Sequence, residues 1–257
     1  MTIREILAMI TQGRREGSLL LVVMASLASG AAAPVWAQQF SEAEIFFELN
    51  DTDGDLGIHA SIDGGPYTKL TVEDPRGLTI LTVGAQGRLA KQGLTQLFLE
   101  SAEPSFDELA PETFFRRFPE GVYEIEGVRN GVEFEATAEL SHVMAARVEN
   151  ILVAGVPAAE DCDAVPLPSV SDPILIDWDP VTESHPEVGE EGEVEIVRYQ
   201  FFVEQGDVKF AVDLPPTVTT FQVPSEILAS GGTFKFEIIA RTADLNNTAV
   251  ENCFTLR

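Results

Sequence analysis

Alternating apolar and polar positions predict β-strands along most of residues 38–155. Ile45, Phe47 and Leu49 fall on one face of an extended segment, and Leu56–Ile62 repeats the alternation. A period of two is typical of a strand that is buried on one face only. Further strands are predicted at residues 67–72, 78–83, 122–127, 132–140 and 147–153. We therefore expect this region to fold as an antiparallel β domain.

Turn residues and one change of period divide these strands. Asp63-Gly64-Gly65 predicts a hairpin that joins the strands on either side of it, and Asn130-Gly131 predicts a second hairpin. Residues Pro111–Phe118 have acidic and proline residues at the start and two arginines at the end. Because the helix dipole favours that order, the segment predicts a short helix inside the β domain.

A second set of strand patterns follows a proline-rich connector at residues 156–172. An apolar strand contains Trp178 and stops at Pro180, and further strands are predicted at residues 196–204, 219–223 and 233–241. This pattern resembles a fibronectin type III domain. The resemblance implies an Ig-like β-sandwich over residues 173–257 and a binding or spacer role, without naming a ligand.

The resemblance has two departures, and the two halves of the chain show no sequence repeat. Phe234 stands where these domains usually carry the tyrosine of the tyrosine corner, so the hydroxyl hydrogen bond of that corner is lost. The segment Val181–Glu195, between the second and third strands, is long and acidic. The fold expected for the whole chain is mainly β, with an N-terminal β-rich domain followed by the sandwich.

The first 37 residues have the layout of a secretory signal. Three arginines precede the apolar run Leu19–Ala33, and Pro34-Val-Trp-Ala37 follows it with small residues at the positions that a signal peptidase reads. We expect cleavage after Ala37, so that the mature chain begins at Gln38 and is periplasmic or extracellular. The alternative is a membrane anchor, for which the apolar stretch is short. No later stretch is long enough to span a bilayer, so no transmembrane segment is expected in the mature chain.

Charge excludes some partners, since the chain carries 42 acidic against 16 basic residues and a formal net charge of −26. Such a surface repels nucleic acid and anionic lipid headgroups, so no nucleic-acid partner is expected. It suits divalent cations, basic partners or a salty medium. The simplest explanation is a solvated surface that maintains solubility.

The chain has only two cysteines, Cys162 and Cys253. An even, low count in an oxidising compartment predicts one disulfide bridge, which would join the entry of the sandwich to its last strand. Two unpaired thiols are the alternative.

Asp51-Thr52-Asp53-Gly54-Asp55 is the sharpest candidate for a metal site. Carboxylates at alternate positions of a tight loop can converge on Ca²⁺, which prefers oxygen ligands. The loop is not an EF-hand, because Leu56 and Ile62 stand where that motif requires glycine and glutamate. Asp51, Asp53 and Asp55 are therefore predicted as Ca²⁺ ligands, with a solvated turn as the alternative.

The sequence gives little support for catalysis. His59, His142 and His185 are separated from one another and from both cysteines, and known zinc, nucleophile-elbow and phosphate-loop motifs are missing from the sequence. Because carboxylates are abundant, the residue types alone do not exclude a glycosidase that uses a pair of acidic residues. A cluster of Phe114, Phe115 and Phe118 is interpreted as a plug for the β core, although it would also suit a peptide or glycan platform.

These features together predict an exported, non-enzymatic binding protein of the cell envelope or extracellular space, assisted by Ca²⁺. Its partner would be a protein or a glycan. One alternative is a secreted polysaccharide-active enzyme or an accessory carbohydrate-binding module, and another is a structural envelope component.

Overall fold

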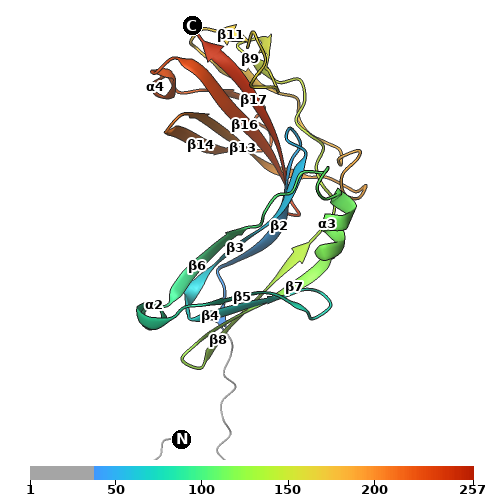
Figure 1. The fold of residues 1–257 in the computed structure, drawn as a ribbon, viewed down its shortest axis with the longest axis vertical. Coiled ribbons are helices and arrows are strands. Elements are labelled where there is room, and N and C mark those ends of the chain that lie inside the picture. Colours follow the sequence, from blue (N-terminus) through green and yellow to red (C-terminus); the bar gives the residue numbers. More distant parts are fainter. Residues whose placement is uncertain (1–37) are drawn as a thin grey trace, which may run out of the picture. The chain divides into compact units, whose positions relative to one another are not determined.

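The computed structural model describes residues 38–257, which form two β-sandwiches (Figure 1). The predicted signal peptide lies outside the described residues. None of the helices within the described part of the chain is long and apolar enough to cross a membrane. The mainly β fold expected from the alternation of residues is confirmed.

The first sandwich has eight strands and two short helices. They are β1 (Gln38–Gln39), β2 (Glu42–Asn50), β3 (Asp55–Tyr67), β4 (Lys69–Glu73), β5 (Thr79–Gly84), α2 (Gly87–Gln92), β6 (Leu94–Glu100), α3 (Pro111–Arg117), β7 (Gly121–Arg129) and β8 (Val132–Leu140). One layer has the order β2-β3-β6, and the other has the order β5-β4-β7-β8. Strand β1 extends the second layer by pairing with β8 in parallel.

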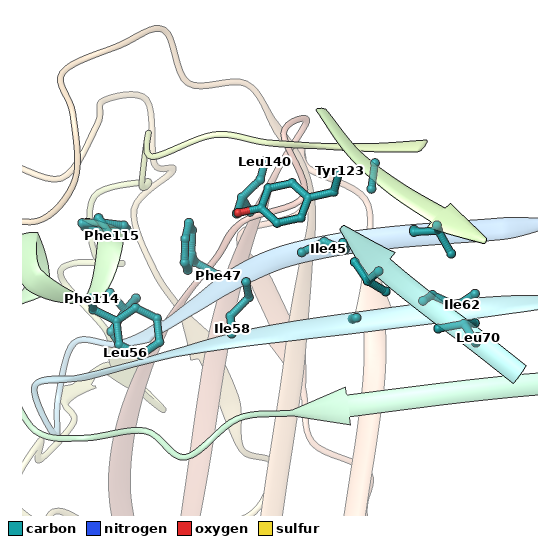
Figure 2. Packing of buried hydrophobic residues seen from close by; sticks show 14 of the residues in the cluster. Ile45, Phe47, Leu56, Ile58, Ile62, Leu70, Phe114, Phe115, Tyr123 and Leu140 are labelled. Carbon is teal, nitrogen blue, oxygen red and sulfur yellow. The ribbon is translucent and has the colours of Figure 1, made fainter. Parts of the chain in front are cut away.

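The core of this sandwich lies between its two layers (Figure 2). Phe47, Leu56 and Ile58 point inward from β2 and β3, as the alternation predicted. Helix α3 forms at the predicted place and buries Phe114 and Phe115, whose ring centroids lie 6.1 and 5.0 Å from that of Phe47. The interpretation of these phenylalanines as a plug for the core is therefore confirmed.

The hairpin predicted at Asp63-Gly64-Gly65 is wrong. Strand β3 continues through these residues, and the chain then crosses to the other layer as β4. The glycines are needed for close packing instead, since a Cβ at Gly64 would lie 2.8 Å from Phe40 Cδ1 and one at Gly65 would lie 2.7 Å from Phe134 Cε1. The hairpin predicted at Asn130-Gly131 is confirmed by the pairing of β7 with β8.

The second sandwich has nine strands and one short helix. They are β9 (Leu152–Val153), β10 (Val156–Pro157), β11 (Ser169–Val170), β12 (Leu175–Asp177), β13 (Ile196–Gln205), β14 (Val208–Leu214), β15 (Thr220–Gln222), α4 (Ser225–Leu228), β16 (Gly232–Thr242) and β17 (Asn247–Leu256). One layer has the order β10-β9-β12-β15, and the other contains β14-β13-β16-β17. The strand expected at 147–153 is reduced to β9 and belongs to this sandwich.

The two sandwiches repeat one topology, although the sequence shows no repeat. Without the short strands β1, β10 and β11, each sandwich has seven strands. In both, the first, second and fifth of these strands along the chain form one layer, and the other layer has the order fourth, third, sixth and seventh. The tyrosine corner expected of such folds is in the first sandwich, where the Tyr123 hydroxyl donates to the Pro119 carbonyl oxygen at 3.0 Å. Phe234 is the third residue of β16, as Tyr123 is of β7, and it stacks on Phe254 instead.

Residues 156–172 are fastened to the second sandwich. Strand β10 pairs with β9, β11 pairs with β17, and Cys162 forms a disulfide bridge with Cys253. The predicted disulfide is present in the structure. The exact domain boundaries expected from the sequence stay a prediction.

One sheet runs through both sandwiches, because β17 pairs with β2 in parallel (Figure 1). Asn246, which is fully buried, supports this junction from the turn before β17. Its side-chain oxygen accepts from the Phe47 backbone N–H at 2.8 Å, and its amide donates to the carbonyl oxygens of Ser141 and Val143 at 2.9 and 3.0 Å. The junction therefore places residues of β16, β17, β2 and β3 on one continuous face.

Candidate binding and metal site

A row of three rings crosses the outward face of β2, β3 and β6. Phe46, His59 and Phe98 belong to these successive strands, with neighbouring ring centroids 5.4 and 6.2 Å apart. Phe46 and His59 are buried, whereas Phe98 is 62% exposed. The guanidinium of Arg241 lies 4.5 Å from the Phe46 ring centroid, which adds a cation–π contact from β16. The row thus ends in a large apolar side chain that faces solvent.

Three ligand-bearing side chains meet beside this row. Glu48, His59 and Glu103 each offer one ligand atom, and these atoms all lie within 4.8 Å of one another. His59 Nε2 is 2.9 Å from Glu103 Oε1, and Glu48 accepts a hydrogen bond of 2.8 Å from the Asn247 amide. One imidazole nitrogen and two carboxylates form a set of donors that suits a divalent cation.

Two further carboxyl groups near this set have raised pKa values. Burial raises the pKa of Glu237 to about 7, with repulsion from Glu48 and Glu251 adding to the effect. Burial likewise raises the pKa of Asp55 to about 6, and repulsion from Glu103 and Asp53 adds to the effect. Both groups also interact with several neighbouring carboxylates, so negative charge is crowded on this face.

The loop predicted to bind Ca²⁺ joins β2 to β3, and its acidic residues contact different partners. Asp51 Oδ1 lies 2.8 Å from His185 Nε2, and Asp51 Oδ2 lies 2.9 Å from an Arg147 nitrogen. The hydrogen bond from His185 lowers the pKa of Asp51. Asp53 accepts a 3.3 Å hydrogen bond from the Asn50 amide. Asp55 interacts with the carboxylates of Glu103 and Glu48, which belong to the group around His59. Ca²⁺ binding by this loop stays a prediction.

A second group with metal-ligand types lies near the α3 end of the first sandwich. It consists of Glu120, His142 and Glu190, whose ligand atoms also lie within 4.8 Å of one another. His142 Nε2 is already 2.8 Å from the Phe118 carbonyl oxygen, and both glutamates are exposed. This group is therefore less well prepared for a cation than the one at His59.

Sequence reasoning missed the site at His59 because its members are far apart in the chain. The histidines are isolated from one another, as expected, but His59 and His185 each pair with a distant carboxylate. Their partners, Glu103 and Asp51, are 44 and 134 residues away. Gly57 lies between the apolar residues Leu56 and Ile58, and a glycine inside a strand is the one local signal that another part of the chain packs closely there.

No protein-family model matches the chain, and no curated protein sequence matches it. A two-domain fibronectin type III segment of chicken tenascin is 11% identical, with 84% of this chain and 98% of that chain covered and a TM-score of 0.30. The human OSCAR ligand-binding domain is 11% identical, with 82% and 97% covered and a TM-score of 0.26.

A tetra-tandem repeat from the extending region of a large adhesion protein is 13% identical, with 84% of this chain and 50% of that chain covered and a TM-score of 0.26. The strand order and the tyrosine corner are the better evidence, and on that evidence the sandwiches of this chain are fibronectin type III-like.

Proposed function

We propose that the mature chain is an exported, non-enzymatic protein that binds a protein or glycan at or outside the cell envelope. The predicted signal peptide supports export, and the disulfide bridge between Cys162 and Cys253 suits an oxidising compartment. By analogy of fold alone, two fibronectin type III-like sandwiches in tandem form a scaffold for a binding or spacer role.

The observation that carries the proposal is the exposed aromatic ring of Phe98 beside the acidic cluster. Strand β6 is the last strand of the eight-stranded sheet, and Phe98 stands on its outward face. Aromatic side chains are enriched among the residues that carry most of the binding energy at interfaces, and charged residues surround them there. Glu48 and Glu103 lie beside the same ring row, so the partner of the metal-free chain should present an apolar group with positive charge next to it.

Binding without catalysis can be tested on the native envelope. The mature chain, residues 38–257, is purified and incubated with the envelope fraction of its native cell, and both bound protein and released soluble sugar are measured over time. The proposal predicts saturable binding and no release of sugar. Sugar release that rises with time would favour the polysaccharide-active alternative, and the lack of saturable binding would contradict the proposal.

Export has a separate test. Protein isolated from the native cell should begin at or near Gln38, which terminal sequencing determines. Full-length protein retained inside the cell would contradict this part of the proposal.

A further inference from the structure

The geometry points to a binding site for a divalent transition-metal ion of the Zn²⁺ class, formed by Glu48, His59 and Glu103. This inference does not depend on the proposed function. It assigns to the chain a metal site other than the loop Asp51–Asp55, with a different ligand chemistry.

The three side chains come from segments that the sheet holds in register. Glu48 lies on β2 and His59 on β3, and these strands pair through Phe46 with His59 and Glu48 with Gly57. Glu103 follows β6, and Ser101, two residues before it, is attached to β3 by two hydrogen bonds, from Ser101 N to the Ile58 carbonyl oxygen at 3.1 Å and from Ile58 N to Ser101 Oγ at 3.0 Å. Glu48 and His59 are therefore fixed by strand pairing, and the segment that carries Glu103 is fixed to β3 through Ser101.

Gly57 provides the space that Glu103 occupies. A Cβ at this position would lie 2.7 Å from Glu103 Cγ, which is closer than real Cβ contacts allow. The missing side chain lets Glu103 lie over the sheet between Glu48 and His59. Glycine weakens a strand, because it has no side chain to pack. Its presence at position 57 is explained by the approach of the Glu103 carboxylate, which any larger residue would block.

The surroundings orient the ligands. The His59 side chain is only 5% exposed and is packed between the rings of Phe46 and Phe98, so its imidazole has little freedom. Glu48 is held by the Asn247 amide from β17 at 2.8 Å. Hydrogen bonds of this kind orient ligands and raise metal affinity in known sites. The His59–Glu103 contact of 2.9 Å is one that a cation would replace.

The ligand set selects the class of ion. Imidazole nitrogen favours Zn²⁺ and its neighbours among the transition metals, whereas Ca²⁺ takes six to eight oxygen ligands. Three protein ligands leave one tetrahedral position for water or for a group on a partner. Asp55 and Glu237 lie close enough to repel Glu48, and a bound cation would offset this repulsion.

Isothermal titration of the untagged mature chain, first stripped with EDTA, tests the inference. Zn²⁺ should bind with a stoichiometry of one at this site, and Ca²⁺ at the same concentrations should not displace it. Glu103→Gln and His59→Asn should each weaken Zn²⁺ binding at least tenfold. Glu135→Gln, an exposed glutamate on β8, is the matched control and should bind as the wild type does.

Two further measurements keep the test decisive. Far-ultraviolet circular dichroism checks that each variant folds. If His59→Asn does not fold, Glu103→Gln alone is used to test the site. Co²⁺ replaces Zn²⁺ as a spectroscopic probe, and its visible spectrum should change in Glu103→Gln but not in Asp53→Asn, which alters the neighbouring loop. Equal Zn²⁺ affinity in wild type and Glu103→Gln, or binding that only Asp53→Asn weakens, would overturn the inference.

Discussion

Glu237 on β16 pairs with Glu251 across the strands and lies near Glu48, and burial raises its pKa to about 7. An acid with a higher pKa in the folded chain than in the unfolded chain makes folding less favourable as pH rises above its unfolded value, here 4.5. The cost is fully present above the folded pKa. The wild type should therefore lose stability between about pH 4.5 and 7 through this group.

Glu237→Gln should remove that loss. We expect the variant to be more stable than wild type by about 1–3 kcal/mol at pH 8, with the difference disappearing towards pH 4.5, because one pKa unit corresponds to about 1.4 kcal/mol. Urea unfolding in EDTA at both pH values measures the difference. Glu124→Gln, an exposed residue of β7, is the control. A gain that is the same at both pH values would contradict the assigned cause.

Individual buried residues were the most predictable part of the chain. Phe47 and Ile58 are core residues because strand alternation places them on the apolar face, and Phe114 and Phe115 are buried because the short helix α3 packs its aromatic residues against the core. His59 was not predictable in the same way. Its environment depends on Glu103, which the fold brings to it from 44 residues away.

At the scale of elements, the loop between β2 and β3 allows a direct test of the Ca²⁺ prediction. Adjacent carboxylates repel one another, so a bound Ca²⁺ should raise the melting temperature of the wild type. Asp53→Asn combined with Asp55→Asn should abolish the rise. Mg²⁺ at the same concentration is the control for ionic strength, which also affects so acidic a protein.

An equal gain from both ions, in wild type and double variant alike, would mean that the loop is only a turn. The structure gives Asp51 a separate role, because His185 and Arg147 hold its carboxylate. The comparison therefore leaves Asp51 unchanged.

Strands were predictable from alternation, but their partners were not. Asp63-Gly64-Gly65 has the composition of a hairpin turn, yet β3 runs through it because Phe40 and Phe134 need the space above the glycines. Local sequence cannot distinguish a glycine that turns the chain from one that lets a distant ring approach. The repeated topology could not be predicted from the sequence either, because the two sandwiches share their strand order without sharing a sequence pattern.

At the scale of the molecule, the disulfide bridge connects residues that are 91 positions apart. Chain-entropy arguments give a loop of this size about 4–5 kcal/mol of stabilisation. Cys162→Ala combined with Cys253→Ala should reduce the free energy of unfolding by about that amount, as measured by urea unfolding. Wild type treated with reductant is the control. A double variant as stable as the oxidised wild type would contradict the expectation.

The pairing of β17 with β2 makes the face that carries the proposed binding role, and no pattern in the sequence predicts it. Parallel pairing of these strands uses backbone groups, which every residue has, and the buried Asn246 is its main side-chain support. The face then combines Phe98 and Glu48 of the first sandwich with Glu237 of the second. Recognition through this face is the central claim.

Binding of Phe98→Ala to the native envelope fraction tests that claim most directly. Val132→Ala is the matched control, because Val132 is an exposed apolar residue on β8, in the opposite layer. Removal of a central aromatic contact should weaken binding at least tenfold, which corresponds to about 1.4 kcal/mol or more, while the control keeps the wild-type affinity. Wild-type affinity in Phe98→Ala, or an equal loss in both variants, would contradict recognition through this face.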